Sequence, residues 1–210
     1  MPTFSGPTTA TISEATLPGT GVGLTVSAAT SAADSATIAR YDITNSVNNG
    51  GTDSMGTFAI DPSSGVVILA KALDYETDTS HVITVTTTTT DGITATQNYT
   101  INVTDVNEVS TIAVDSNGVT TFIEDNSNTA DGAIVLTYTL SDPESSAQTI
   151  VLSDTTNYVL DASNKKVKLT SAGAALANSG RPLPNFTLQA VDSADNSLKS
   201  NTIVISPTVT

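Results

Sequence analysis

A two-residue alternation of apolar and polar side chains is the feature that most constrains how this chain can fold. The alternation recurs in segments rich in threonine, valine, serine and isoleucine: residues 24–28, 82–90, 98–103 and 202–205. Successive side chains of a strand point to opposite faces, so this period is typical of strands with one buried face. The only predicted helix is the short segment 171–178.

Turn-forming sequences separate the predicted strands. They include residues 49–51, 61–65, 91–92, 117–118 and 194–196, all rich in Asn, Asp and Gly or Pro. We interpret residues 61–65 as a hairpin turn rather than as a ligand loop. Many short strands joined by such turns predict an all-β, antiparallel sandwich.

A weak internal repeat divides the 210 residues into two halves. Residues 21–26 resemble 132–138, residues 66–69 resemble 166–169, and Asp91 corresponds to Asp192. A period of roughly a hundred residues suits tandem sandwiches better than a solenoid. We therefore predict two Greek-key, immunoglobulin-like β-sandwiches, residues 1–106 and 107–210, arranged end to end.

The charge balance excludes several classes of partner. The chain has 21 acidic and 7 basic residues and a net charge of −14, so it would be repelled by nucleic acid and by anionic membranes. Cysteine is absent, which removes disulfides, thiol catalysis and thiolate metal sites. No apolar run reaches the length of a membrane helix, and we predict no direct membrane insertion. Divalent cations are the favoured partners.

Carboxylates gather in sequence around the boundary between the two halves. The first half ends in Asp105-Val106-Asn107-Glu108; Glu14 and the segment Leu73-Asp74-Tyr75-Glu76 precede it, and Asp142-Pro143-Glu144 follows it. Calcium takes six to eight oxygen ligands, which one short loop seldom supplies. Several loops converge where two β-domains meet, so the pattern predicts a calcium site at that junction.

The first half resembles a cadherin domain over nearly its whole length, and the second half resembles the divergent cadherin-like repeats of large bacterial surface adhesins. The first resemblance is carried by Glu14 and residues 41–45, 58–67, 73–76 and 103–108, in that order and spacing. The second is carried by residues 138–144, 169–176 and 186–192. Together, the two resemblances imply an extracellular, cell-surface location within a larger protein, in which calcium makes a spacer for cell adhesion rigid.

The resemblance also implies a ligand set for two or three calcium ions. Glu14, Asp74 and Glu76 would come from the first domain, Asp105, the Val106 carbonyl, Asn107 and Glu108 from the linker, and Asp142, Glu144 and Asp192 from the second domain. At the outer end of the first repeat, Thr30 and Ala32 stand where the second repeat has Asp142 and Glu144. We therefore expect one calcium site. The implied partners are calcium, neighbouring repeats, and a cell-surface protein or glycan.

A carbohydrate- or protein-binding β-sandwich is the alternative function. Aromatic residues make up 4% of the chain and tryptophan is absent, although five tyrosines remain. An enzyme is not expected, because the only histidine, His81, is not paired with a serine by any recognisable motif. His81 precedes a predicted strand, and we expect it to be a surface residue.

Overall fold

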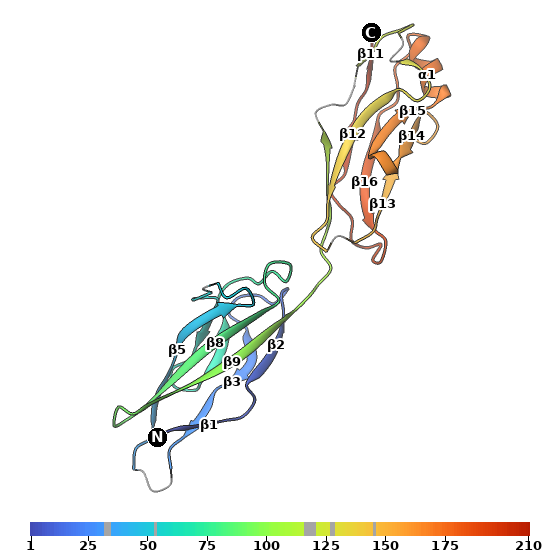
Figure 1. Ribbon diagram of the computed structural model, residues 1–210. Helices are drawn as coiled ribbons and strands as arrows, with labels where there is room; N and C mark the ends of the chain where they lie inside the picture. The colour runs from blue at the N-terminus through green and yellow to red at the C-terminus, as the bar shows by residue number, and fades with distance from the viewer. Residues whose placement is uncertain (32–34, 53, 116–120, 127–128, 145) are drawn as a thin grey trace. The chain divides into compact units, whose positions relative to one another are not determined.

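A computed structural model describes residues 1–31, 35–52, 54–115, 121–126, 129–144 and 146–210 (Figure 1). The chain folds into two compact units, Met1–Val106 and Asn107–Thr210, and each is described by itself. The predicted turn at residues 117–118 and the residues Ala32 and Asp34 lie outside the described part. Within that part, no helix is long and apolar enough to cross a membrane.

The first unit consists of two principal sheets and a two-stranded ribbon. The four-stranded sheet has the order β2 (Thr9–Ser13), β9 (Thr94–Thr104), β8 (Ser80–Thr89) and β5 (Ile38–Asn48). The three-stranded sheet has the order β3 (Gly21–Thr25), β7 (Val66–Leu69) and β6 (Phe58–Ile60), and β1 (Thr3–Ser5) pairs with β4 (Ser27–Ala29).

The core of the first unit joins the inner faces of the two principal sheets. It brings Leu24 and Leu69 of the smaller sheet together with Ile83, Tyr99 and Ile101 of the larger one, all fully or almost fully buried. Burial alternates at every residue of β8, as the sequence pattern predicts.

The same alternation corrects the prediction for His81. This residue is the second of β8 and points to the buried face, where only 3% of it is exposed. The prediction of a surface residue is therefore wrong. Strand β8 begins two residues before the predicted strand, which places His81 on the inner side of the pleat.

The first strand of the large sheet departs from a purely antiparallel pattern. Strand β2 pairs in parallel with β9, from Thr9 opposite Thr100 to Ser13 opposite Thr104. The chain therefore enters the unit beside the strand by which it leaves. Because the two strands run in the same direction, their carboxyl ends, with Glu14 and Asp105, lie at the same edge.

The turn at residues 61–65 joins β6 to β7, as predicted. The side chain of Asp61 accepts hydrogen bonds from the backbone N–H groups of Ser63 (2.9 Å) and Ser64 (2.7 Å). Gly65 has a φ of +73°, and a Cβ at this position would lie 2.1 Å from the backbone oxygen of Val26. Only glycine fits this approach.

The second unit repeats the two-sheet plan. One sheet has the order β10 (Thr111–Asp115), β12 (Ile134–Ser141), β15 (Lys166–Leu169) and β14 (Tyr158–Asp161), and the other has the order β13 (Gln148–Leu152), β16 (Phe186–Asp192) and β17 (Ile203–Ile205). Strand β11 (Thr121–Phe122) pairs in parallel with β18 (Thr208–Val209). A 3-10 helix, η2 (Ala162–Asn164), and the helix α1 (Ser171–Asn178) complete it.

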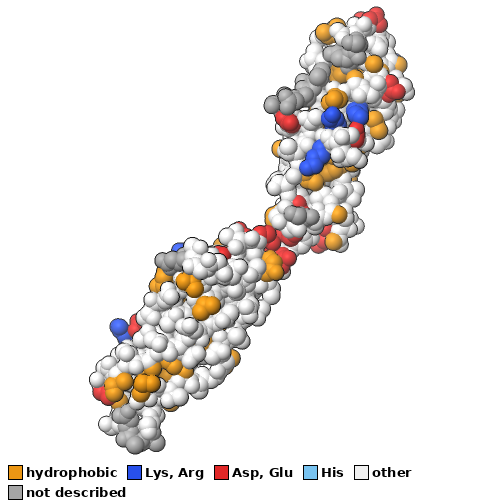
Figure 2. Space-filling view, viewed as in Figure 1, with side chains coloured by type: hydrophobic (Ala, Val, Ile, Leu, Met, Phe, Trp, Pro, Cys, Tyr) orange, Lys and Arg blue, Asp and Glu red, His pale blue; other side chains and the backbone are white. Residues whose placement is uncertain are grey.

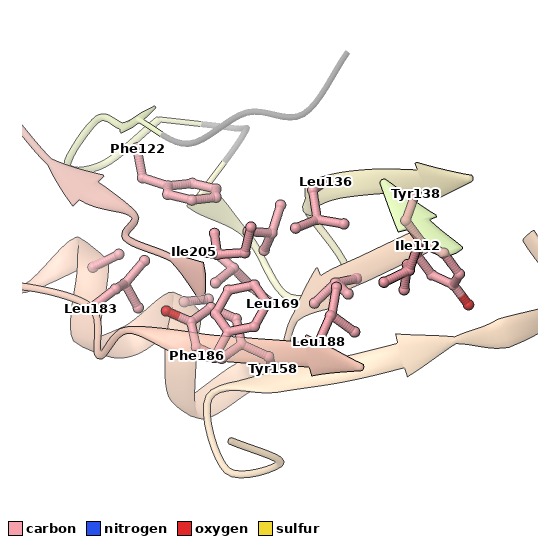
Figure 3. Close-up of a cluster of buried hydrophobic side chains, with 14 residues drawn as sticks. Ile112, Phe122, Leu136, Tyr138, Tyr158, Leu169, Leu183, Phe186, Leu188 and Ile205 are labelled. Atoms are coloured by element: carbon pink, nitrogen blue, oxygen red, sulfur yellow. The ribbon is translucent and has the colours of Figure 1, made fainter. Parts of the chain in front are cut away.

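Aromatic and aliphatic side chains from both sheets fill the core of the second unit (Figure 3). The rings of Tyr158 and Phe186 pack with their centroids 4.2 Å apart, next to the fully buried Leu169 and Leu188. Helix α1 spans the predicted residues and is capped at its N-terminus by Thr170, whose side chain accepts a hydrogen bond from the Gly173 N–H. The prediction of an all-β fold with two sandwiches is confirmed.

Candidate metal centre

Glu14 connects three segments of the first unit. It directly follows β2 and is only 7% exposed. One carboxylate oxygen accepts a hydrogen bond from the backbone N–H of Tyr75 (2.6 Å), and the other accepts one from the backbone N–H of Val106 (2.7 Å). These charge-assisted bonds fix the carboxylate in place and hold the acidic loop and the end of the unit against it.

Two further carboxylates reach Glu14. One oxygen from each of Glu14, Glu76 and Asp105 lies within 4.8 Å of the others, and Glu76 and Asp105 are exposed. Three carboxylates this close repel one another unless a cation lies among them. The atoms available as metal ligands are all oxygens, which hard cations such as calcium prefer.

Asp74 is oriented differently from its neighbour Glu76. Its two side-chain oxygens accept hydrogen bonds from the backbone N–H (3.1 Å) and the hydroxyl (3.0 Å) of Thr77. It is not among the three carboxylates that converge. The structure therefore shows Asp74 stabilising the turn that carries Glu76.

In the second unit, Ser146 links two of the predicted ligands. Its backbone N–H donates to one oxygen of Asp142, and its hydroxyl donates to Asp192 (2.6 Å). The other oxygen of Asp142 accepts from the hydroxyl of Ser110 (3.1 Å). Asp142 and Asp192 therefore belong to one hydrogen-bonded network.

Asp192 ends β16 and is 1% exposed. Besides the Ser146 hydroxyl, its carboxylate accepts from the side-chain amide of Gln148 (3.1 Å) and from the backbone N–H groups of Ala194 and Asp195 (2.7 Å each). These hydrogen bonds, that of the Ser146 hydroxyl first, hold the pKa of Asp192 well below its usual range. The carboxylate is therefore ionised and already surrounded by donors.

Three carboxylate or amide oxygens of the second unit are buried without a hydrogen-bond partner in the described structure. They are Oδ1 of Asn107, Oε2 of Glu144 and Oε1 of Gln148. The other oxygen of Glu144 accepts a hydrogen bond from the backbone N–H of Glu108 (3.0 Å). A buried acceptor without a donor is costly, and a cation is the kind of group that would satisfy such oxygens. The residues thus fit calcium.

Each predicted ligand now has a place. Glu14, Glu76 and Asp105 converge, Val106 contacts Glu14 through its N–H, and Asp74 faces Thr77. The backbone N–H of Glu108 donates to the carboxylate of Glu144, and Asp142 and Asp192 share Ser146. Asn107 carries a buried oxygen without a hydrogen-bond partner among the described residues. The assignment of all these residues as ligands stays a prediction.

Sequence reasoning missed Ser110, Ser146 and Gln148, which orient the carboxylates of the second unit. One of them had a signal in the strand pairing, since Gln148 lies directly opposite Asp192 in the β13–β16 register. Ser110 and Ser146 had none, because serines are common throughout this chain.

Basic side chains are few on the face shown in Figure 2, where red acidic side chains appear in several places.

Comparison with known proteins gives the family of the first unit. The cadherin domain model matches residues 8–104. Residues 8–104 form a cadherin domain. The matched segment runs from the residue before β2 to the last residue of β9, so the cadherin domain includes Glu14 and the loop that carries Glu76. Comparison with curated protein sequences gives no match.

Solved structures of cadherins share the fold of both units. Protocadherin Gamma B2 extracellular cadherin domains 3-6 match with a TM-score of 0.73 and 21% identity, covering 100% of this chain and 47% of that one. Drosophila N-cadherin EC1-4 matches with a TM-score of 0.67 and 22% identity, covering 98% and 48%. The chain thus spans about half the length of these cadherin structures, and the likeness shows the fold.

Cadherin repeats are non-enzymatic adhesion modules that bind calcium and adjacent repeats, and cadherin EC domains are extracellular parts of larger proteins. The coarse prediction of a cadherin domain is therefore confirmed for residues 8–104, and for the second unit the likeness shows the cadherin fold. The acidic groups described above are consistent with cadherin calcium sites.

Proposed function

We propose that this protein is a calcium-stabilised spacer segment of a cell-surface adhesin, built from two successive repeats that meet between Val106 and Asn107. The observation that carries the proposal is the convergence of Glu14, Glu76 and Asp105 at the carboxyl end of the cadherin domain. These carboxylates are close enough to share one cation, and nothing basic is bonded to the buried Glu14 in the described residues.

Calcium is the ion that the chemistry favours. The proposed ligands offer only oxygen, which excludes the nitrogen and sulfur sites preferred by zinc and copper. Calcium also tolerates irregular geometry and a mixture of carboxylates, amide oxygens and backbone carbonyls. Calcium at extracellular concentrations would neutralise part of the net charge of −14.

The proposed site holds two or three ions and draws on both repeats. Asp142, Glu144, Asn107 and Glu108 would add the ligands that the first unit lacks, together with the Val106 carbonyl. Asp192 already accepts four hydrogen bonds, so we assign it the smallest share of coordination. Asp74 would contribute mainly by holding the turn that presents Glu76.

We further propose that the parent protein is a bacterial surface adhesin. The absence of cysteine supports this, because a secreted repeat without disulfides needs another source of rigidity, and calcium would supply it. The proposed partners are neighbouring repeats and a cell-surface protein or glycan.

The alternative function, a carbohydrate-binding module, is weakened by where the tyrosines lie. Four of the five are buried in the two cores: Tyr41, Tyr99, Tyr138 and Tyr158. Their rings cannot stack on a sugar, and few aromatic surfaces remain for that purpose.

Calorimetric titration of the whole 210-residue chain with calcium tests the proposal. We expect two or three bound ions with dissociation constants of about 10⁻⁵ to 10⁻³ M. The Glu76→Gln variant should bind at least one ion fewer, whereas Asp42→Asn, an exposed carboxylate paired with Arg40, should bind like the wild type. Absence of calcium binding at millimolar concentration would overturn the proposal.

A further inference from the structure

The single histidine of the chain is enclosed inside the cadherin domain. His81 is 3% exposed, and its ring packs edge-on against Phe58 with the centroids 5.2 Å apart. Its Nδ1 lies 3.3 Å from the hydroxyl of Ser54, and that hydroxyl is 2.8 Å from the hydroxyl of Ser46. Its Nε2 is buried and has no hydrogen-bond partner among the described residues.

His81 lies where two connections meet. It lines a cavity of about 460 Å³, together with Ser54 of the β5–β6 connection and Asp74 of the β7–β8 connection. The side chain of Asn48, the last residue of β5, joins the two connections. Its oxygen accepts hydrogen bonds from the backbone N–H groups of Gly50 and Thr52 in the β5–β6 connection, and its amide donates to Asp78 of the β7–β8 connection at 2.6 Å. The β7–β8 connection is the segment that presents Asp74 and Glu76.

Few charged groups face this histidine. From the β7–β8 connection the cavity is lined by Lys71, Asp74 and Asp78; from β5, β6 and the described part of the β5–β6 connection only neutral side chains are present. Asp53 lies outside the described residues. Asp78 accepts the Asn48 amide, and among the described residues no carboxylate is hydrogen-bonded to the imidazole.

These surroundings favour a neutral imidazole. Burial lowers the pKa of His81 below its ordinary value of 6.5, and the nearby carboxylate of Asp78 offsets part of this. Protonation of the ring would place a positive charge in an enclosed site. Both ring nitrogens would then carry a proton, and no acceptor for Nε2 is present among the described residues. The protonated domain can relieve this by separating the two connections.

We propose that His81 is an acid-sensitive latch, which holds the β5–β6 connection against the acidic β7–β8 connection while neutral and releases it when protonated. Release would loosen the segment that presents Glu76 and thereby weaken the calcium site. This last step rests on the proposed function; the latch itself does not. Acid would therefore act at a higher pH than that at which the carboxylates become protonated, near 4.

The sign of the effect follows from linkage. A histidine whose pKa is lowered by folding contributes stability that is fully present above the unfolded value of 6.5. That stability is lost as the pH falls from 6.5 towards the lower folded value. For an imidazole that stays neutral in the folded state, the folding equilibrium constant at pH 5.5 decreases by at most about tenfold.

The latch is tested first on the whole wild-type chain in EDTA, by following the His81 ring resonances by NMR from pH 8 to pH 5. Because the chain has one histidine, the signal needs no assignment. We expect a titration midpoint below 6.5, together with changes at Ser54 and Asp78 amides. A midpoint at or above 6.5 would overturn the proposal.

The second arm compares stability and calcium affinity at pH 7.5 and pH 5.5 in the wild type and in His81→Gln, which cannot titrate. In EDTA, the folding equilibrium constant of the wild type should be several-fold lower at pH 5.5 than at pH 7.5, and that of the variant should decrease clearly less. Calcium affinity should fall several-fold more in the wild type than in the variant. Equal pH responses of stability in both proteins would refute the latch.

The outcomes separate the two proposals. If neither protein binds calcium but the wild type alone loses stability at pH 5.5 in EDTA, the latch stands and the proposed function fails. If calcium binds to both with the same pH response, its coupling to the latch is refuted. Where His81→Gln fails to fold, the NMR midpoint of the wild type still decides.

Discussion

The carboxylate of Glu14 accepts a hydrogen bond from the backbone N–H of Val106, a residue 92 positions later in the chain. Its other oxygen accepts one from Tyr75. Glu14, which is predicted to be a metal ligand, therefore also joins the last residue of the first unit to the carboxyl end of β2. Substitutions at Glu14 and at Glu76 should consequently have different effects.

Replacing Glu14 by alanine should destabilise the first unit even without calcium. The backbone N–H groups of Tyr75 and Val106 would lose their charged acceptor in two part-buried hydrogen bonds, at a cost of about 2–4 kcal/mol in the free energy of unfolding. Glu76→Ala removes an exposed carboxylate and should leave the calcium-free stability within about 0.5 kcal/mol of wild type. Urea denaturation in EDTA measures both. Equal stability of the two variants would contradict the structural role of Glu14.

Removing calcium should lower the melting temperature of the wild type, since a ligand that binds only the folded state stabilises it by mass action. At a free calcium concentration a hundred times the dissociation constant, the gain is about 2.7 kcal/mol. Calorimetric melts in 5 mM calcium and in EDTA make the comparison. The same melts on Glu76→Ala serve as the control, and a full calcium response there would exclude Glu76 as a major ligand.

The serine that bridges the acids of the second unit offers a third test. Ser146→Ala removes the hydroxyl bonded to Asp192 and keeps the backbone N–H that bonds Asp142. We expect the pKa of Asp192 to rise towards its ordinary value, because the Ser146 hydroxyl is the largest cause of its depression. Carboxyl NMR titration measures this shift. Ser163→Ala, at an exposed position in η2, is the control and should leave Asp192 unchanged.

Acid should destabilise the second unit through its depressed carboxylates. The pKa of Asp192 is lowered mainly by the Ser146 hydroxyl, and that of Asp161 mainly by its hydrogen bond from Lys168. Groups with lowered folded pKa values stabilise the protein above their unfolded values near 3.8, and this stability is lost as the pH falls below them. Melting curves between pH 5 and pH 2 in EDTA should show the loss. Asp161→Asn should show a smaller one.

Alanine substitutions at Gly65 and Gly92 should distinguish the cost of steric crowding from the cost of a positive φ. Both have positive φ, +73° and +84°, but a Cβ at Gly92 meets open space whereas one at Gly65 lies 2.1 Å from the Val26 oxygen. Gly92→Ala should cost about 1 kcal/mol. Gly65→Ala should cost more than about 3 kcal/mol, because the backbone near Val26 must move. Chemical denaturation of both variants distinguishes them, and equal costs would contradict the crowding at Gly65.

Local sequence patterns predicted much of the secondary structure. The helix at residues 171–178 and the strands around residues 82–90 and 98–103 are all present, because local propensity and burial point to the same structure there. The pattern could not show that β2 pairs in parallel with β9, since pairing direction depends on contacts far apart in sequence. It also placed His81 outside a strand that in fact begins at Ser80.

The acidic residues were easier to find than their arrangement. The sequence predicted Glu14, Glu76 and Asp105 as neighbours, and they converge. It could not predict that Asp74 would face Thr77, because adjacent loop carboxylates differ in direction by a single backbone rotation. Nor could it predict the donors around Asp192, which come from two separate stretches of the chain, residues 146–148 and 194–195.

The parallel pairing of β2 with β9 has a mechanical consequence. Five residue pairs join the two strands, from Thr9 opposite Thr100 to Ser13 opposite Thr104. When the chain is pulled at Thr9 and at Thr104 in opposite directions, the force runs along both strands and loads all their hydrogen bonds at once, in shear. A hairpin pulled at its two open ends would instead lose its bonds one after another. The first unit is thus built to bear tension along the path that the polypeptide takes through it.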